Sequence, residues 1–189
     1  MRKVVVGLFS SLDGVVEDPL TFLTDWDDDV MDAHMAEGLQ AQDAVLLGRR
    51  SYDEWAAFWP DSTLEPYATF INSVAKYVVT STPLEQEWSG ARAVEGDLVA
   101  FVRGLRDRPG GDIGVHASIS VAQALLAAGL VDELRLTIVP AIAGTGRRLL
   151  DGLPAQRLET IRATTSPTGK VLVDYRIVRE PSESPAGQG

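Results

Sequence analysis

The sequence predicts an α/β protein whose central sheet is mixed, mostly parallel, and ends in an antiparallel C-terminal hairpin. Short apolar runs alternate with helical segments over the first two thirds of the chain, which is typical of parallel strands joined by right-handed crossovers. Continuous apolar runs such as Val4–Val6 and Ala44–Leu47 indicate strands that are covered on both faces. The last third instead contains long alternating segments around a turn at Pro167–Lys170, which favours a hairpin.

These patterns place the elements in order along the chain. The first strands are expected at Lys3–Phe9, Asp43–Leu47, Lys76–Ser81, Arg92–Val94 and Asp112–His116. The helices are expected at Asp28–Ala41, Ser51–Phe58, Asp97–Arg108 and Ser120–Ala128. The C-terminal strands are expected at Glu133–Pro140, Arg157–Thr165 and Lys170–Arg179. Residues 1–180 are predicted to form one domain, and the composition of residues 181–189 is that of a disordered tail.

Composition narrows the classes of function. The chain has 189 residues and a net charge of −10, which argues against nucleic acid as a partner. It contains no cysteine, so disulfides, thiol nucleophiles and cysteine-ligated metal sites are excluded, and we expect no metal site. No segment has the length of a signal peptide or a membrane span. We therefore expect a cytoplasmic protein that acts on a small molecule and does not bind membranes.

The most informative segment is the end of the second predicted strand. An apolar run stops at Gly48 and is followed by Arg49, Arg50 and Ser51. Ser51 and Glu54 have the spacing of a capping box, which predicts a helix start in this turn. A glycine permits close backbone approach, helix-start amides attract anions, and arginines bind phosphate in bidentate fashion. The segment thus predicts a phosphate-binding turn; the alternative is an ordinary turn with two solvated arginines.

Three other predicted strand ends carry hydrogen-bonding groups. In open α/β sheets, ligands bind beyond the carboxyl ends of the strands. Ser120 and Gln123 form a second predicted capping box. These strand ends are Ser10–Gly14, Thr80–Thr82 and His116–Ser120.

The acidic cluster Asp25–Asp29 precedes the first long helix. It is interpreted either as helix capping or as a source of one carboxylate that faces a ligand, with Trp26 stacking on that ligand or covering the core. His34 falls within a predicted helix and is expected to be structural. No nucleophilic triad, Walker A segment or Rossmann fingerprint is present.

Several segments together resemble stand-alone members of the dihydrofolate reductase-like superfamily, close to the reductase half of the riboflavin-biosynthesis deaminase–reductase. The resemblance spans about residues 3–179. Each segment is weakly specific, but their order and spacing are more specific. The segments are Ser11–Gly14, Leu47–Tyr52, Lys76–Ser81, Gly110–Ile113, Gly129–Leu136 and Pro140–Leu149.

The resemblance implies a three-layer fold, an NADPH-dependent reductase and a homodimer. The glycine–arginine turn would hold the pyrophosphate of the cofactor, and the hydroxyls near Ser81 would lie by the 2′-phosphate. The residues assigned to NADPH are Gly48, Arg49, Arg50, Ser51, Thr80, Ser81, Thr82, His116, Ala117, Ser118, Ile119 and Ser120.

The substrate side follows from the same resemblance. Ser11, Trp26, Gly144 and Gly146 are expected to line the substrate site. Asp13 and one of Asp27 or Asp28 are the candidates for orienting the substrate or relaying a proton. The implied substrate is a small heterocycle or sugar derivative, such as a phosphoribosylaminouracil or a dihydropteridine.

The chain also departs from the family pattern. Where relatives have glycines after the fifth strand, this chain has Ala117 and Ile119, and a β-branched residue resists positive φ. This difference predicts a shifted or weakened NADPH site. It also favours the main alternative, a nucleotide-binding module without turnover; a protein-interaction scaffold is the third. Arg147 and Arg148 are either solvated loop charges or a pocket for a sugar phosphate.

Overall fold

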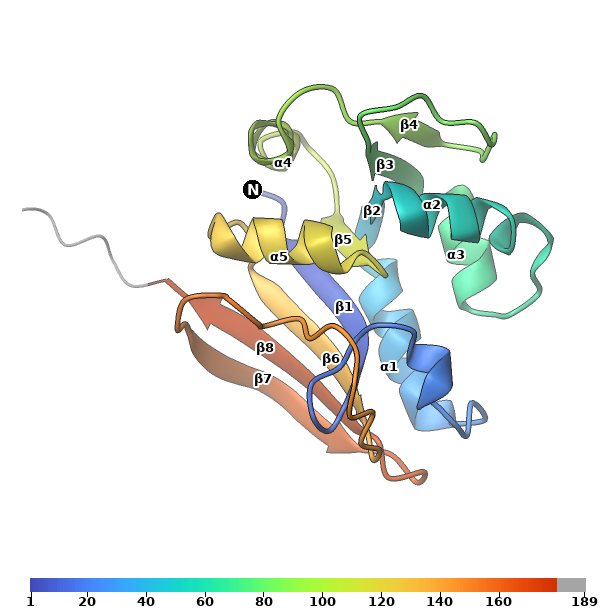
Figure 1. The fold of residues 1–189 in the computed structure, drawn as a ribbon, viewed down its shortest axis with the longest axis vertical. Coiled ribbons are helices and arrows are strands. Elements are labelled where there is room, and N and C mark those ends of the chain that lie inside the picture. Colours follow the sequence, from blue (N-terminus) through green and yellow to red (C-terminus); the bar gives the residue numbers. More distant parts are fainter. Residues whose placement is uncertain (180–189) are drawn as a thin grey trace, which may run out of the picture.

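A computed structural model describes residues 1–179, so the predicted tail at residues 181–189 lies outside the described residues. One sheet of eight strands runs through the molecule in the order β4-β3-β2-β5-β1-β6-β8-β7 (Figure 1). The six strands from β4 to β6 are parallel, and β8 and β7 are added antiparallel. The predicted mixed sheet with a C-terminal hairpin is confirmed.

The strand bounds agree with the predicted ones to within a few residues. They are β1 Val4–Ser11, β2 Gln42–Gly48, β3 Ala75–Val79, β4 Ala91–Ala93, β5 Asp112–His116, β6 Glu133–Val139, β7 Arg157–Thr165 and β8 Val171–Val178. The helices are α1 Asp29–Gln40, α2 Arg49–Ala56, α3 Tyr67–Ser73, α4 Leu98–Arg106 and α5 Ile119–Ala127, with short 3-10 turns η1 Pro19–Thr21 and η2 Trp59–Asp61. None of the helices in residues 1–179 is long and apolar enough to cross a membrane.

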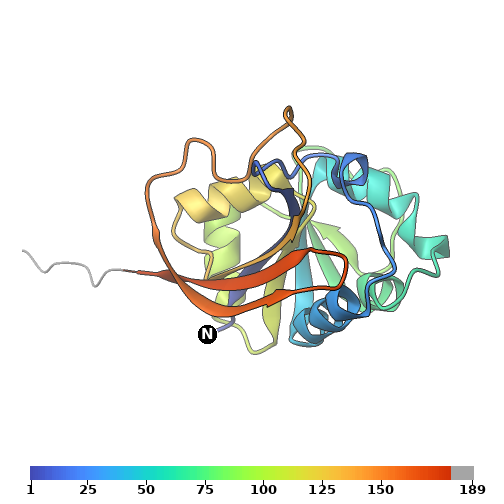
Figure 2. The ribbon, with the colours of Figure 1, turned by 90° about the horizontal axis from the view of Figure 1, so that it is seen from below.

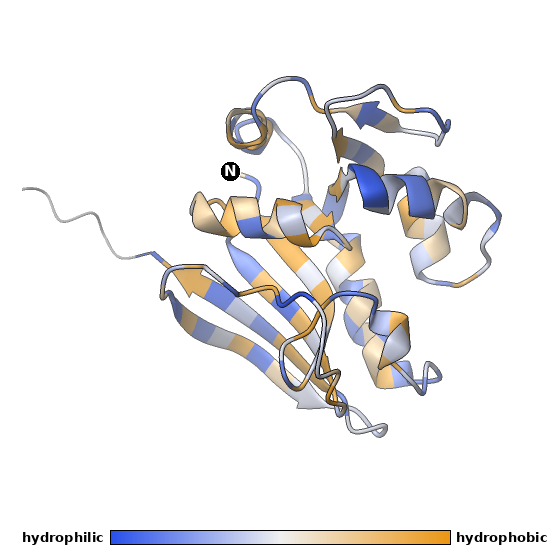
Figure 3. Ribbon diagram, in the orientation of Figure 1, coloured by the Kyte–Doolittle hydropathy of each residue, from blue (hydrophilic) through white to orange (hydrophobic). Residues whose placement is uncertain are grey.

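The two faces of the sheet are packed by different helices. Leu46 of β2 belongs to the core that α4 and α5 cover, whereas its neighbour Leu47 belongs to the core under α2 and α3. Figure 2 shows α4 and α5 on the side of the sheet opposite α1. Apolar residues follow β1 and α5, while α2 and β7 are mainly hydrophilic (Figure 3). The apolar β1 and β2 runs are therefore covered on both faces, as their sequences predict.

Both predicted capping boxes are wrong. Helix α2 begins at Arg49, and its capping residue Gly48 offers no side chain. Helix α5 begins at Ile119 after Ser118, whose hydroxyl does not cap the helix either. The serines expected to cap these helices, Ser51 and Ser120, instead contact segments that are distant in the sequence. The α3 helix was not predicted from the sequence.

Candidate functional site

The ends of β2 and β5 lie side by side because these strands are paired in parallel. The Gly48 N–H donates a hydrogen bond to Ser118 Oγ at 2.7 Å. The Ser51 hydroxyl donates to the carbonyl of Ala117 at 3.2 Å. These two contacts join the starts of α2 and α5, and neither first turn carries an acidic side chain. Two positive helix ends therefore meet at one place, which favours an anionic ligand.

The backbone conformation expected to need glycine falls on Ala117, which has φ 52°. Ile119 is instead the first helical residue of α5, and its side chain is buried in the core under that helix. The predicted conflict at Ile119 is therefore wrong, because this side chain points into the core. Ala117 has the smallest side chain that an L-residue can bring to this left-handed conformation.

Arg49 and Arg50 are both paired with carboxylates of their own helix. Arg49 Nε donates to both oxygens of Asp53 at 2.8 Å, and its Nη1 donates to Thr82 Oγ1 at 2.7 Å. Arg50 Nε donates to Glu54 at 3.0 Å, and its side chain is 74% exposed. The structure thus brings Arg49 to the Thr80–Thr82 segment, as the predicted grouping requires. It also neutralises both guanidinium groups by i,i+4 pairing.

Asp13 joins the end of β1 to the segment that follows β6. Its carboxylate accepts hydrogen bonds from Ser11 Oγ at 2.7 Å and from the Ala143 and Gly144 N–H groups at 2.9 and 3.0 Å. The Ser11 hydroxyl and these amides lower the pKa of Asp13 to about 2. Arg148 pairs with the same carboxylate at 3.3 Å. These contacts favour an anchoring role for Asp13 over a proton relay.

The other glycine expected near the substrate, Gly146, lies against the same segment. It has φ 122°, and a Cβ added there would lie 2.6 Å from Val15 Cγ1. Glycine is therefore required at this position by conformation and by space.

The acidic cluster has one buried member. Asp28 caps α1 by accepting from the Met31 N–H at 3.1 Å, which confirms the capping interpretation for this residue. Burial disfavours its charged form, but hydrogen bonds from Thr168 and neighbouring groups outweigh burial and hold the pKa of Asp28 below its usual range. Lys170 Nζ lies 3.4 Å away.

The remaining members of this region are more accessible. Asp27 and Trp26 are exposed, and the Trp26 ring packs edge-on against Phe9 at 5.8 Å between centroids. Asp32, one turn into α1, was not singled out from the sequence. Burial and the carboxylates of Asp28, Asp29 and Asp27 raise the pKa of Asp32, which favours its protonated form.

His116 is the last residue of β5, and its side chain turns back toward Gln42 at the start of β2. Its Nδ1 pairs with the Tyr67 hydroxyl, and its Nε2 lies 2.9 Å from Gln42 Oε1. Burial lowers the pKa of His116 to about 4. The neutral ring is thus held on both sides by protein groups. His34, expected to be structural, pairs with Asp174 at 3.0 Å.

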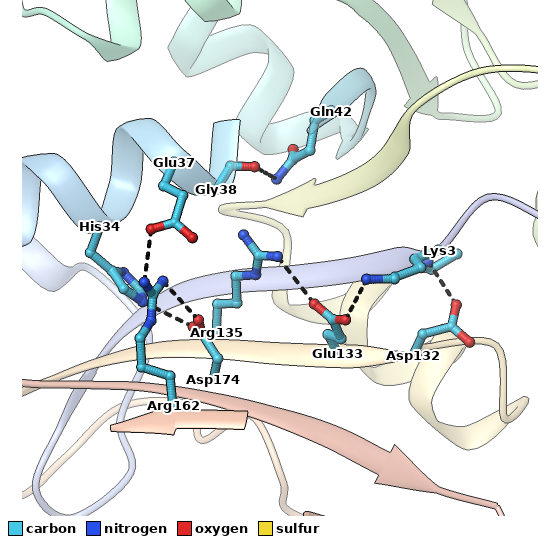
Figure 4. A network of polar contacts seen from close by, with 11 residues as sticks. Lys3, His34, Glu37, Gly38, Gln42, Asp132, Glu133, Arg135, Arg162 and Asp174 are labelled. Carbon is cyan, nitrogen blue, oxygen red and sulfur yellow. Dashed lines mark hydrogen bonds and ion pairs between the residues drawn. The ribbon is translucent and has the colours of Figure 1, made fainter. Parts of the chain in front are cut away.

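A charged network lies between α1 and strands β6, β7 and β8, on the face of the sheet opposite α4 and α5 (Figure 4). Glu133 accepts from Lys3 at 2.8 Å and from Arg135 at 3.1 Å. Arg162 of β7 contacts Glu37 at 2.8 Å and Asp174 at 3.1 Å. Figure 4 shows these side chains converging from the helix and the strands. Each cation named here has a carboxylate partner.

Known protein families and structures similar to this chain agree with this fold. A model of the RibD C-terminal domain matches residues 2–172. The uncharacterised protein YyaP of Bacillus subtilis is 29% identical over 181 residues, covering 92% of this chain and 94% of that protein.

Two solved structures are similar in fold. A putative riboflavin biosynthesis protein from Shewanella sp. PV-4 superimposes with a TM-score of 0.76 and 21% identity, covering 94% of this chain and 100% of that one. Dihydrofolate reductase from Enterococcus faecalis, complexed with NADP(H), gives a TM-score of 0.63 and 13% identity, covering 93% and 96%. The chain therefore has a dihydrofolate reductase-like fold and belongs to the RibD C-terminal domain family.

Proposed function

We propose that this protein is an NADPH-dependent reductase that transfers a hydride to a small heterocyclic or sugar-derived substrate. The observation that carries the proposal is the joining of the α2 and α5 starts by the Gly48–Ser118 and Ser51–Ala117 hydrogen bonds. The reductase-type family, and the NADP(H) named for the Enterococcus faecalis enzyme, support this choice of anion. When bound, the cofactor would supply the hydride, and the protein would bind, orient and exclude water.

The residues present fit the phosphate part of such a cofactor. The amides at the start of α5 follow Ala117, whose small side chain leaves the backbone accessible. In this proposal Gly48, Ser51, Ser118 and Ser120 hold the pyrophosphate. The hydroxyls of Thr80, Ser81 and Thr82 lie on the 2′-phosphate side.

On the substrate side, Ser11, Trp26, Gly144 and Gly146 are proposed to border the substrate, with Asp13 fixing this border. The proton donor is assigned to the acidic start of α1. Asp32 fits that role better than Asp28, because the pKa of Asp32 is raised by burial and neighbouring carboxylates whereas that of Asp28 is lowered.

The test places a negative charge at the joined helix starts. Ser120→Asp puts a carboxylate in the first turn of α5, where it stabilises the helix but repels phosphate. We expect wild-type protein to bind NADPH more tightly than NADH in a calorimetric titration, and Ser120→Asp to weaken NADPH binding by about tenfold or more. Ala127→Asp is the matched control, because it adds the same charge to an exposed position at the far end of α5.

Two outcomes separate the alternatives. Equal NADPH affinity in Ser120→Asp and wild type would contradict the proposed cofactor site. Tight binding without oxidation of NADPH in the presence of dihydropterins or pyrimidine-ribose substrates would favour a binding module. That second function has a specific basis, because the carboxylates of Asp13 and Asp28 are saturated by protein donors. The expected homodimer is checked by light scattering of the purified protein.

A further inference from the structure

The arginine best placed to meet an anion at the joined helix starts comes from the segment between β6 and β7. Arg147 Nη2 donates to Ser120 Oγ at 3.0 Å and lies 3.3 Å from Gln123 Oε1. Both partners are neutral oxygens on the first two turns of α5. Within residues 1–179, the Arg147 guanidinium forms no ion pair with a carboxylate.

The two arginines of α2 differ from Arg147 in this respect. Arg49 is paired with Asp53 at 2.8 Å and Arg50 with Glu54 at 3.0 Å. An anion that approaches either of these arginines must compete with a fixed carboxylate four residues away. An anion that approaches Arg147 meets an uncompensated charge, so its charge-assisted hydrogen bond is the stronger one.

We propose that Arg147 is the cation that binds the diphosphate of the ligand at the start of α5, and that Arg49 and Arg50, which are already paired with carboxylates of α2, do not bind it. This inference rests on the proposed function for the identity of the ligand. The charge argument itself concerns any diphosphate.

The backbone around Arg147 is held in place by contacts with the loop after β1. The Val16 N–H donates to the carbonyl of Arg147 at 2.9 Å, and the Arg147 N–H donates to Glu17 Oε2 at 3.1 Å. The Gln123 amide is oriented in turn, because its Nε2 donates to the carbonyl of Arg148 at 3.1 Å and Oε1 is thereby turned toward Arg147. Arg147 thus approaches α5 from a fixed position.

Asp13 contributes to the same placement. It binds the Ala143 and Gly144 amides and pairs with Arg148, the residue next to Arg147. Asp13 is therefore a positioning residue for Arg147 in this proposal. Glu17 acts in the opposite direction, since its carboxylate is near the Arg147 backbone and reduces the positive potential there.

The experiment compares four proteins with two probes, NADPH and inorganic pyrophosphate, by calorimetry at two salt concentrations. Arg147→Gln removes the charge but keeps a donor for Ser120. We expect it to raise the Kd for both probes by about tenfold or more and to reduce their dependence on salt. Arg50→Gln should stay within about twofold of wild type, because its charge is already compensated. Glu17→Gln should tighten binding of both probes.

The outcomes are distinguishable. If Arg147→Gln binds both probes as wild type does and NADPH binds wild type, the Arg147 inference is overturned and the reductase proposal stands. If pyrophosphate binds wild type but not Arg147→Gln, while NADPH binds neither, the Arg147 site stands and the NADPH-dependent function fails. If wild type binds neither probe, both are overturned. Because Arg147 is exposed, an unchanged urea midpoint is expected for Arg147→Gln and confirms that the variant is folded.

Discussion

The network under α1 and the region at the joined helix starts contain similar residues but differ in charge compensation. Lys3, Arg135 and Arg162 each contact a carboxylate, and Glu133 and Asp174 are almost fully buried between them (Figure 4). At the helix starts, Arg147 contacts two neutral oxygens, and the first turns of α2 and α5 carry no acidic side chain.

This difference indicates which charges hold the fold and which are available to a ligand. A buried ion pair that loses one partner leaves a charge without compensation, so the charges of this network are needed for the stability of the fold. Helix α1 also leaves space for the network, because a Cβ at Gly38 would lie only 2.7 Å from Arg135 Nη1. Arg147 at the helix starts differs, because its guanidinium contacts only the neutral oxygens of Ser120 and Gln123.

The largest effect is expected from breaking the network. Asp174→Ala removes the partner of both His34 and Arg162, and we expect it to lower the free energy of unfolding by about 3 kcal/mol. Glu159→Ala is the control, because its pair with Arg176 lies on the same face but is exposed, and it should cost under about 0.5 kcal/mol. Urea denaturation measures both. Equal losses, or a weakened NADPH affinity in Asp174→Ala alone, would remove the distinction between the two regions.

The next effect concerns His116, which is the last residue of β5 and is neutral. Burial lowers the pKa of His116 from its ordinary value of 6.5 to about 4 in the folded protein, so the unfolded chain binds the proton more readily. The stability contributed by neutral His116 is therefore fully present above pH 6.5. It is lost as the pH decreases toward 4, by at most about 1.4 kcal/mol per pH unit.

His116→Gln should flatten this dependence in urea titrations between pH 7 and pH 4.5. Tyr67→Phe keeps the histidine buried while removing its hydroxyl partner, so the dependence should remain. A wild-type stability that does not change across this range would show that His116 is not buried as described.

The smallest effect tests a compensated charge at the ligand side. Arg50→Gln removes a guanidinium that is exposed and paired with Glu54, so the free energy of unfolding should change by less than about 0.5 kcal/mol. Thermal unfolding of Arg50→Gln beside wild type checks this value. A loss of several kcal/mol would mean that Arg50 stabilises the fold as the network residues do.

The sequence predicts the strands well because their apolar runs are set by burial on both faces. It predicts the capping serines poorly, because Ser51 donates to the carbonyl of Ala117 and Ser120 accepts from Arg147, both distant in the sequence. The α3 helix was missed, being only the seven residues Tyr67–Ser73 with no capping side chain. Local pattern also cannot show that Arg147 reaches α5 while Arg49 and Arg50 are neutralised, since the first contact spans 27 residues and depends on the fold.

One residue of β7 decides which face of the sheet receives a charge. Thr160 is opposite Tyr175, and Arg162 is opposite Asp174, so Ile161 is the additional residue of a bulge. In a regular ladder, Arg162 would be opposite Val173 and would point toward the apolar side under α5, because successive side chains alternate between faces. The ion pair between the outer strand and α1 therefore depends on the bulge, which lets the strand carry Ile161 without turning Arg162 to the apolar face. Deleting Ile161 would leave Arg162 opposite Asp174 in a regular ladder, so the pair should survive the loss of the bulge but not its straightening with Ile161 in place.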